Sequence, residues 1–470
     1  MKKFLFILLV LTSFLLSACG GESETNTESF PTWYYNPFGF ASLTVSERSE
    51  NEASVKVATE IEFLDALLNQ ENQVIEITAD LNLGSKEVEA KLKVIGKNLN
   101  DYRNVYRAHS NKPLLHPVLI ETGVGRIRIR KRENLMIYSK TGNSIKHASF
   151  EIDGSKDIVF RNLKFSELWE WDDAGQGKYK RNDWDYFVIE KSAGIWFDHL
   201  TFKQAYDGII DVKDGCSNLT LSFSKLDFNP NEFIKTQINA LEENQDLHPY
   251  YQSLRAKGIT KEELIRLASY QKKGFNLGNT TDGSGFESIT FTFHHLEVYN
   301  LQDRFPRIRK GDAHLYQVIL DNSGITDLGL KINPKGETLV NQGIVTTEDG
   351  AVFMENSLFI NVSTPIKTHQ ESNVDSKYTG KFRILNSAYR KGEREYFGSS
   401  EGKFLVWEPT NNHPLIPFAF RNYEKLPYYY NTLLDIAFLP EFFEKHPTGA
   451  LTLKEFNWLK IDNKLHLRGE

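Results

Sequence analysis

The sequence predicts an all-β solenoid, a parallel β-helix, because short apolar strands recur along its 470 residues. Residues 157–165 (DIVFRNLKF), 194–202 (GIWFDHLTF), 218–228 (NLTLSFSKLDF) and 288–298 (SITFTFHHLEV) each place an apolar strand before a polar or kinked middle and a second apolar end. HLYQVILDN, AVFMENSLFIN and KFRILNSAY continue the series at spacings of roughly 20 to 40 residues. The Asn-Gly and Asp-Gly hairpin turns that a sandwich would need are sparse. Stacked coils are therefore the better prediction.

Segments of different character flank and interrupt this series. Ile61 to Leu68 has the spacing of a short amphipathic helix, which is expected to cap the first coil. A polar insert at about 229–271 contains Thr260-Lys261-Glu262-Glu263, a capping box that predicts a helix. The aromatic tail 411–470 shows helical spacing around Leu433 to Phe443 and is expected to pack on the β-helix.

The amino terminus predicts export. Two lysines precede an apolar run from Phe4 to Leu16, which is the pattern of a signal peptide over 1–18. The ending Leu-Ser-Ala-Cys resembles a bacterial lipoprotein signal, which implies that Cys19 carries lipid and that 19–50 is a polar tether. The β-helix would then occupy 51–410. We expect anchoring to the membrane at the cell surface or outer membrane, with plain secretion as the alternative.

Cysteine content limits how the exported chain is stabilised. Apart from Cys19 the chain has only Cys216, so no internal disulfide can form in the mature protein. With 40% hydrophobic residues there is ample material for one large core. We expect a monomer without a nucleic-acid partner.

Two pairs of aspartates carry the first candidate chemistry. Asp183 and Asp185 lie two apart in NDWDYFVI, so an extended backbone would project both carboxylates to one side. Asp207 and Asp211 in DGIID would join them if adjacent coils stack in register. Such an oxygen-rich site suits calcium, which takes about six to eight oxygen ligands. For each pair taken alone, the alternative is that the aspartates stabilise a turn beside a glycine by bonding to its backbone.

A basic run, RFPRIRK from Arg304 to Lys310, is the second candidate feature. It places three arginines and a lysine together in a chain with a formal net charge of −6. Arginine forks match carboxylates and phosphates with two bonds at a time, which favours an anionic partner. A solvated basic loop is the alternative reading of any such run.

The order of the motifs resembles the pectate lyases of polysaccharide lyase family 1. DWDYFVIEKSAGIWFDHLTF is similar to the family's calcium aspartates and the strand that follows them, and DGIIDVKDGCSNLTLSFSKL to its second acidic pair. KKGFNLGNT resembles its lysine-bearing turn, and SITFTFHHLEVYNLQDRFPRIRKGDAH its His-His strand and Arg-x-Pro-x-x-Arg signature. The resemblance covers roughly 156–322 and implies a right-handed parallel β-helix. It also implies a calcium-dependent pectate lyase that cleaves polygalacturonate or its oligomers by β-elimination, leaving 4,5-unsaturated ends.

The resemblance also implies roles for single residues. Lys273 and Arg309 match residues that bind the substrate, and Arg304 matches the proposed catalytic base. The four aspartates, Asp183, Asp185, Asp207 and Asp211, match the surroundings of the calcium ion, although many relatives have glutamate at the position of Asp207. A free guanidinium titrates above about 12, so an arginine base predicts an alkaline activity optimum.

Three other functions would use parts of the same sequence. A non-catalytic β-helix adhesin or polysaccharide-binding lipoprotein would share the fold and the anchor, and a pectin lyase would prefer esterified substrate. A hydrolase on the same polymer would need an acid and a base flanking the glycosidic bond, which the adjacent Asp172 and Asp173 do not offer because neighbours in a strand face opposite ways. The strand histidines and the loop tryptophans are predicted to be packing or hydrogen-bonding residues: His199, His294, His295, His314, Trp169, Trp171 and Trp184.

Overall fold

The structure is a computed structural model that describes residues 38–46, 54–109, 117–171, 173, 182–369, 375–398, 416–430 and 433–458. The predicted signal peptide, Cys19 and most of the tether lie outside these residues. No helix in the described segments combines the length and the apolar character that crossing a bilayer requires.

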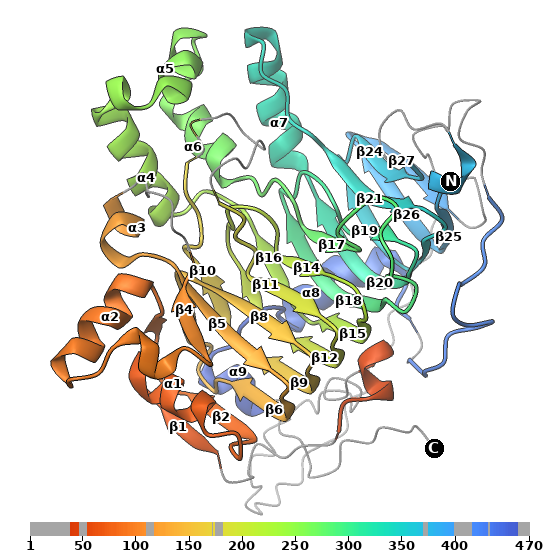
Figure 1. The fold of residues 1–470 in the computed structure, drawn as a ribbon. Coiled ribbons are helices and arrows are strands. Elements are labelled where there is room, and N and C mark those ends of the chain that lie inside the picture. The colour runs from red at the N-terminus through yellow and green to blue at the C-terminus, as the bar shows by residue number, and fades with distance from the viewer. Residues whose placement is uncertain are drawn as a thin grey trace, which may run out of the picture.

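The predicted all-β solenoid is confirmed, because parallel strands stack coil upon coil in three rows (Figure 1). The first row contains β1 Val55–Val57, β2 Val74–Ile77, β6 Glu133–Tyr138, β9 Lys156–Arg161, β12 Ala193–Asp198, β15 Ser217–Ser222, β18 Thr290–Tyr299, β20 Asp312–Asp321, β22 Ala351–Glu355 and β25 Lys381–Leu385. The second contains β3 Leu81–Asn82, β7 Ser144–Lys146, β10 Lys164–Ser166, β13 Thr201–Phe202, β16 Lys225–Asp227, the latter halves of β18 and β20, β23 Leu358–Ile360 and β26 Ser387–Lys391. The last strand of this row, β27 Arg394–Gly398, pairs antiparallel to β26.

The third row is a separate sheet, called here the third sheet. Its order is β4 Tyr106–Ala108, β5 Gly125–Arg130, β8 Ala148–Asp153, β11 Phe187–Glu190, β14 Ile210–Val212, β17 Phe275–Leu277, β19 Arg307–Arg309, β21 Gln342–Thr347 and β24 Thr364–Lys367. β4 pairs antiparallel to β5, and the later strands are parallel. Because the pairing is in register, residues at matched positions face the same side of the sheet in every coil.

The kinked middle of each sequence repeat is a one-residue bend between the first and second rows. The residues before the bend pair in register from Arg161 through Asp198 to Ser222 and onward. The next residue of each coil has positive φ, between 42° and 54°, at Asn162, His199, Phe223, His295, Gln317, Asn356 and Asn386. Stacking of these bends in successive coils turns the chain from one face of the solenoid to the next.

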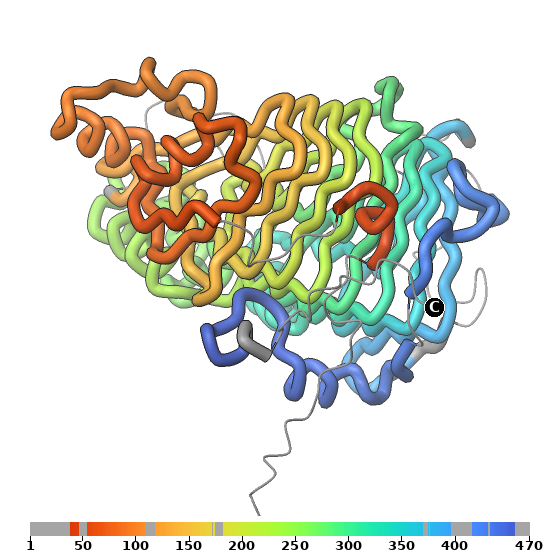
Figure 2. The backbone as a smooth tube through the Cα atoms, turned by 90° about the horizontal axis from the view of Figure 1, so that it is seen from below, coloured from red at the N-terminus to blue at the C-terminus, as the bar shows by residue number. Residues whose placement is uncertain are grey.

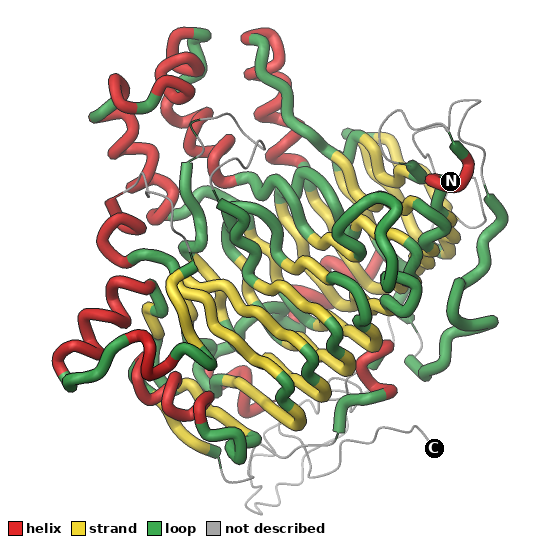
Figure 3. The backbone as a smooth tube through the Cα atoms, in the orientation of Figure 1, coloured by secondary structure: helices red, strands yellow, loops and turns green. Residues whose placement is uncertain are grey.

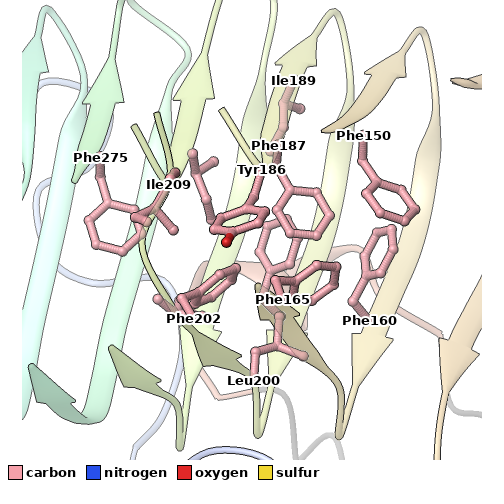
Figure 4. Close-up of a cluster of buried hydrophobic side chains, with 14 of the residues drawn as sticks. Phe150, Phe160, Phe165, Tyr186, Phe187, Ile189, Leu200, Phe202, Ile209 and Phe275 are labelled. Carbon is pink, nitrogen blue, oxygen red and sulfur yellow. The ribbon is translucent and has the colours of Figure 1, made fainter. Parts of the chain in front are cut away.

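Aromatic side chains fill the interior in stacks that run along the solenoid (Figure 4). Phe150 stacks on Phe187 with ring centroids 5.3 Å apart, and Phe165 stacks on Phe202 at 5.4 Å. Phe187 is buried and also lies edge-on to Phe165 at 5.0 Å. In-register pairing makes such ladders, because the same position of each coil points inward.

Helices cover the first end of the solenoid. α1 Glu60–Leu68 begins with a capping box between Thr59 and Glu62, and α2 Ser85–Val94 follows. Their apolar faces join the main core through Phe63, Leu64, Leu67, Val88 and Leu92. α3 Pro117–Thr122 completes this region. The expected helix from Ile61 to Leu68 is thus present at the expected end (Figure 3).

The insert folds as three helices that rise beside the solenoid (Figure 1). α4 Glu232–Glu243, α5 Pro249–Ala256 and α6 Lys261–Ser269 share a second apolar cluster with α7 Ser323–Ile332 and the buried rings of Trp169 and Trp171. The predicted capping box is present, since Thr260 accepts from the Glu263 N–H. Arg266 of α6 donates to the carbonyl of Gly324 at 3.0 Å, which ties α6 to α7.

The carboxyl-terminal segment packs against the outside of the first and second rows (Figure 2). It includes α8 Leu439–Lys445 and α9 Leu453–Trp458. The Leu434 N–H donates to Gln317 at 2.9 Å, and the Ala450 N–H donates to Thr201 at 2.9 Å. The expected helical spacing around Leu433 to Phe443 corresponds to a short 3-10 turn, Ile436–Phe438, followed by α8.

Candidate active site

Three aspartates meet at one edge of the third sheet. Asp183 and Asp185 lie in the turn before β11, and Asp207 lies in the turn before the neighbouring β14. One carboxylate oxygen from each lies within 4.8 Å of the others. Asp185 is 6% exposed, and its Oδ1 accepts from the Gly208 N–H at 2.7 Å. The turns converge because parallel strands enter the sheet at the same edge.

These carboxylates disfavour one another's charge. Desolvation raises the pKa of Asp183 to about 6, and the hydrogen bond and charge of Asp207 act in the same direction. Burial raises the pKa of Asp185 well above its usual range, with Asp207 and Asp211 contributing. A divalent cation would relieve this repulsion, and three hard oxygen donors in one place are the ligand type that calcium prefers. The residues present therefore fit the implied metal.

Asp211 lies beside this group and is held separately. It is on β14, and its Oδ1 accepts from Asn276 Nδ2 at 2.9 Å. Burial raises the pKa of Asp211, with the Asn276 hydrogen bond opposing the shift. The structure brings Asp183, Asp185 and Asp207 into one cluster and places Asp211 next to it, one step into the sheet.

Lys273 reaches the acidic group from the next turn. It precedes β17, and its Nζ lies 2.8 Å from Asp207 Oδ1. Burial lowers the pKa of Lys273; Asp207 opposes this shift and the charge of Arg304 adds to it. The side chain that resemblance assigns to the substrate is therefore ion-paired with a predicted calcium ligand in this structure.

Arg304 lies in the turn before β19, between the acidic group and the strand arginines. Its φ is 67°, and its N–H donates to Asp303 Oδ1 at 2.8 Å. Its Nε lies 3.7 Å from the other oxygen of Asp303, and 18% of its side chain is exposed. Arg304 acts electrostatically on Lys273, Asp211 and Arg309, so these groups share one local field.

Arg309 is held almost entirely within the protein. It is 3% exposed; its Nη1 donates to Asn276 Oδ1 at 3.3 Å and to the Gly278 carbonyl. Its Nε lies 3.5 Å from Glu348 Oε1. Burial lowers the pKa of Arg309, and the charge of Glu348 opposes the shift.

Sequence reasoning missed three residues that hold this arrangement. Asn276 bridges Asp211 and Arg309, and it pairs in register with Asp211 on β14 and Arg307 on β19. Gln271 donates to the Asp207 carbonyl at 2.6 Å and accepts from the Ala205 N–H at 2.8 Å. Glu348 faces Arg309. The one available signal was the place of Asn276 in KKGFNLGNT, a polar residue inside an apolar strand.

The residues predicted to be structural are buried. His199, His294 and His314 are fully enclosed, and His314 bonds to Glu355 at 2.8 Å and to Tyr428 at 2.6 Å. The loop tryptophans Trp169, Trp171 and Trp184 expose 2% or less of their surface. Asp173 bonds to His248 at 3.0 Å, and Asp172 lies outside the described residues.

In sequence and in fold, this chain is similar to pectate lyases. The family model described as "Pectate lyase" matches residues 126–237. Pectate lyase B of Paenibacillus amylolyticus is 38% identical over 321 residues, which cover 65% of this chain and 79% of that protein. The pectate trisaccharide-lyase of Thermotoga maritima is 24% identical over 221 residues, covering 46% and 47% of the two chains.

Solved structures agree with these sequence matches. A pectate lyase from Paenibacillus sp. 0602 aligns with a TM-score of 0.81 and 34% identity, covering 91% of this chain and 98% of that chain. A Bacillus sp. N165 pectate lyase in complex with trigalacturonate aligns with a TM-score of 0.51 and 14% identity, over 88% and 98% of the chains, which shows the fold alone.

The fold and these relatives define a right-handed parallel β-helix polysaccharide lyase, in which acidic and basic side chains meet along one edge of a sheet. Within that class, the chain belongs to the pectate lyase family.

Proposed function

We propose that this pectate lyase depends on calcium and cleaves polygalacturonate, or its oligomers, by β-elimination to leave 4,5-unsaturated galacturonate ends. The observation that carries the proposal is the meeting of Asp183, Asp185 and Asp207 with Lys273 at one sheet edge. A substrate with one carboxylate on each sugar is the ligand that such a mixed site would accept, because cations on both sides can contact the carboxylate.

The aspartates would hold the calcium ion. Asp183, Asp185 and Asp207 offer three carboxylates, and Asp211 lies beside them as a further oxygen donor. When bound, calcium neutralises the substrate carboxylate and so favours loss of the neighbouring proton. Lys273, whose Nζ lies 2.8 Å from Asp207 Oδ1, would exchange this contact for one with a substrate carboxylate.

Arg304 is the proposed base. It would accept the proton from C5, the electron pair would form the C4–C5 double bond, and the C4–O4 bond would break with O4 taking a proton from water. Negative charge that develops toward the C6 carboxylate is stabilised by the surrounding cations more strongly in the transition state than in the ground state. The positive charge of Arg309 contributes to this stabilisation from within the sheet, where contacts with Asn276 and Glu348 hold the side chain in place.

Growth of the ultraviolet absorbance of an unsaturated uronate tests the proposal. Wild-type protein with calcium and demethylated polygalacturonate should produce the absorbance, whereas chelator or Arg304→Ala should lower the rate by on the order of a thousandfold or more. Arg390→Ala is the control, because Arg390 is on β26 and pairs only with Glu395 among the ion pairs of the described residues. Reducing ends without new absorbance would indicate a hydrolase, and retention of the polymer without cleavage would indicate a binding protein. Faster cleavage of esterified pectin would indicate a pectin lyase.

We also propose export with a lipid anchor at Cys19, supported by the sequence pattern around it. Cys19→Ala should move the protein from the membrane fraction to the medium and abolish incorporation of a fatty-acid probe. A wild-type protein that takes up no probe and is released would be a secreted enzyme instead. We expect a monomer, which light scattering after size-exclusion chromatography measures.

A further inference from the structure

Four arginines gather around one carboxylate at the beginning of the third sheet. Glu151 on β8 lies 3.1 Å from Arg126 Nη1, 3.4 Å from Arg107 Nη2 and 3.6 Å from Arg128 Nε, and it accepts from Arg130 Nε at 2.8 Å. Arg126, Arg128 and Arg130 alternate along β5, and Arg107 is on β4. These four residues are called here the arginine cluster.

The arginine cluster lies on the same face of the third sheet as the candidate active site. The in-register pairing runs from Arg128 to Glu151 on β8, then to Val188, Asp211, Asn276 and Arg307 on successive strands. Residues in register on parallel strands face the same side. β5 is three strands from β14, so the cluster lies roughly 14 Å from Asp211 along the solenoid axis. Figure 1 shows these strands side by side.

The cluster carries more positive charge than its acids neutralise. Besides Glu151, Asp153 lies 3.9 Å from Arg130 Nε, and Asp183 acts on Arg126 from the candidate calcium site. Burial lowers the pKa of Arg128, and the neighbouring charge of Arg130 acts in the same direction. Among the described residues, the four guanidinium groups form ion pairs with only two carboxylates, Glu151 and Asp153, in a chain whose net charge is −6.

The geometry leaves the outer guanidinium groups open to solvent. Glu151 has 14% of its side chain exposed and lies beneath the cluster, whereas Arg107 exposes 48% and Arg130 exposes 41%. Glu151 therefore fixes the arginines from below while their outer edges remain available. Planar guanidinium groups bind carboxylates with two parallel hydrogen bonds, so an array of them suits a ligand with regularly spaced carboxylates.

We propose that the arginine cluster is a distal subsite that binds carboxylates of a long polygalacturonate chain beyond the sugars held at the active site. This inference rests on the proposed function for the identity of the polymer. A chain bound at both places gains from the high effective concentration of its second segment. The subsite therefore favours long chains over short oligomers and leaves the chemical step unchanged.

The kinetic test uses the two exposed arginines. Arg107→Gln combined with Arg130→Gln should raise the KM for polygalacturonate by on the order of tenfold, because two solvent-exposed ion pairs are lost, and should leave kcat unchanged. Cleavage of trigalacturonate should not change, since a trisaccharide centred on the candidate active site would end short of the cluster, which lies roughly 14 Å from Asp211. The matched control is Arg390→Gln, which removes an arginine with 38% exposure from the other side of the solenoid. An equal loss on both substrates, or no loss on either, would overturn the subsite.

A binding measurement separates this inference from the proposed lyase activity. Electrophoresis through gels that contain polygalacturonate and chelator should retard the wild type and Arg304→Ala, and should retard the double glutamine variant less. Arg107→Lys with Arg130→Lys keeps the charge and should retain most of the retardation, which excludes misfolding as the cause. If the protein binds the polymer through the cluster but never forms unsaturated ends, the lyase proposal fails and the subsite stands. Equal retardation of the glutamine variant and the wild type would refute the subsite even in an active enzyme.

Discussion

Asn276 is the residue at which the acidic and basic halves of the site meet. An amide can donate on one side and accept on the other, and Asn276 does both, to Asp211 at 2.9 Å and from Arg309 at 3.3 Å. Its own strand, β17, lies between those of its two partners. The acidic side and the arginine side are therefore coupled through one side chain.

Replacing Asn276 with leucine should weaken both halves. Leucine has similar volume and no polar atoms, so Asp211 and the buried Arg309 would each lose a hydrogen bond, at a cost of about 1–3 kcal/mol. We expect kcat/KM on polygalacturonate to fall about tenfold or more, together with the affinity for calcium measured by titration calorimetry. Asn244→Leu, at the exposed end of α4, is the control. Unchanged calcium affinity in Asn276→Leu would contradict the coupling.

Because of Asp183, the thermal stability of the calcium-free protein should depend on pH. Desolvation and Asp207 raise the pKa of Asp183 to about 6, so the folded protein holds a proton that the unfolded chain releases near the usual value of 3.8. The contribution of this protonation to the free energy of unfolding is fully present below the pKa that Asp183 has in the unfolded chain. It is lost as the pH rises through about 6, the pKa in the folded protein. In chelator, Asp183→Asn should therefore gain melting temperature over the wild type as the pH rises from about 4 to about 7.

Calcium should reverse this dependence. In the proposed function the ion would bind the charged carboxylates and protons would compete with it, so calcium affinity should weaken as the pH falls below about 6. Scanning calorimetry at a series of pH values, with and without calcium, measures both effects. If the difference in melting temperature between Asp183→Asn and the wild type in chelator does not vary with pH, the pKa of Asp183 is not raised in the folded protein.

At the scale of elements, β11 joins the site to the core. Phe187 is the first residue of the strand and follows Asp185 by two positions. Its buried ring stacks on Phe150 and packs edge-on against Phe160 at 4.9 Å and Phe197 at 4.8 Å. The position of the acidic turn is thus fixed by an aromatic anchor directly behind it.

Phe187→Ala should cost about 3–5 kcal/mol of unfolding free energy, because it leaves a cavity among stacked rings. Calcium affinity should fall with it, since the turn that holds Asp185 loses its anchor. Phe438→Ala is the control; Phe438 is 59% exposed, so its loss should change stability by less than about 0.5 kcal/mol. Denaturant titration measures both variants. A loss below about 1 kcal/mol for Phe187→Ala would show that the core repacks around the gap.

At the scale of the whole molecule, the carboxyl-terminal segment runs back along the solenoid and covers buried polar groups. Tyr428 is 7% exposed, and its hydroxyl bonds to His314 at 2.6 Å and to Thr292 at 2.9 Å. Further along, the Leu451 N–H donates to Asn162, a bend residue several coils nearer the amino terminus. The segment therefore joins coils that are far apart in sequence.

Tyr428→Phe should lower the unfolding free energy by about 1–2 kcal/mol, because it removes the hydroxyl that bonds to His314 Nδ1 and to Thr292 Oγ1 inside the protein. The adjacent Tyr429 is 85% exposed, so Tyr429→Phe should be neutral and serves as the matched control. Thermal unfolding measures the stability, and limited proteolysis should show earlier cleavage of the segment 416–458 in Tyr428→Phe. Identical melting of the two variants would contradict this role.

The repeats, the bends and the helix caps were predictable because they depend on local properties. Apolar alternation, a recurrent polar middle and the capping residue Thr260 act within a few neighbours, and the structure has them where the sequence indicates. The motif order added the candidate acids, Lys273 and the arginines. Their meeting could not be predicted from spacing alone, because it depends on the register of coils separated by loops of very different length, including the three-helix insert.

The sequence by itself determined that the chain forms β-helix coils and which charged residue types it offers to an anionic polymer. Only the tertiary structure decided that Asp211 lies beside the acidic group of three, that Asn276 links it to Arg309, and that Arg128 and Arg307 lie in one row. The physical reason is that strand pairing fixes which coils are neighbours and which side chains share a face. Charges distant along the chain acquire a common field only after the coils stack.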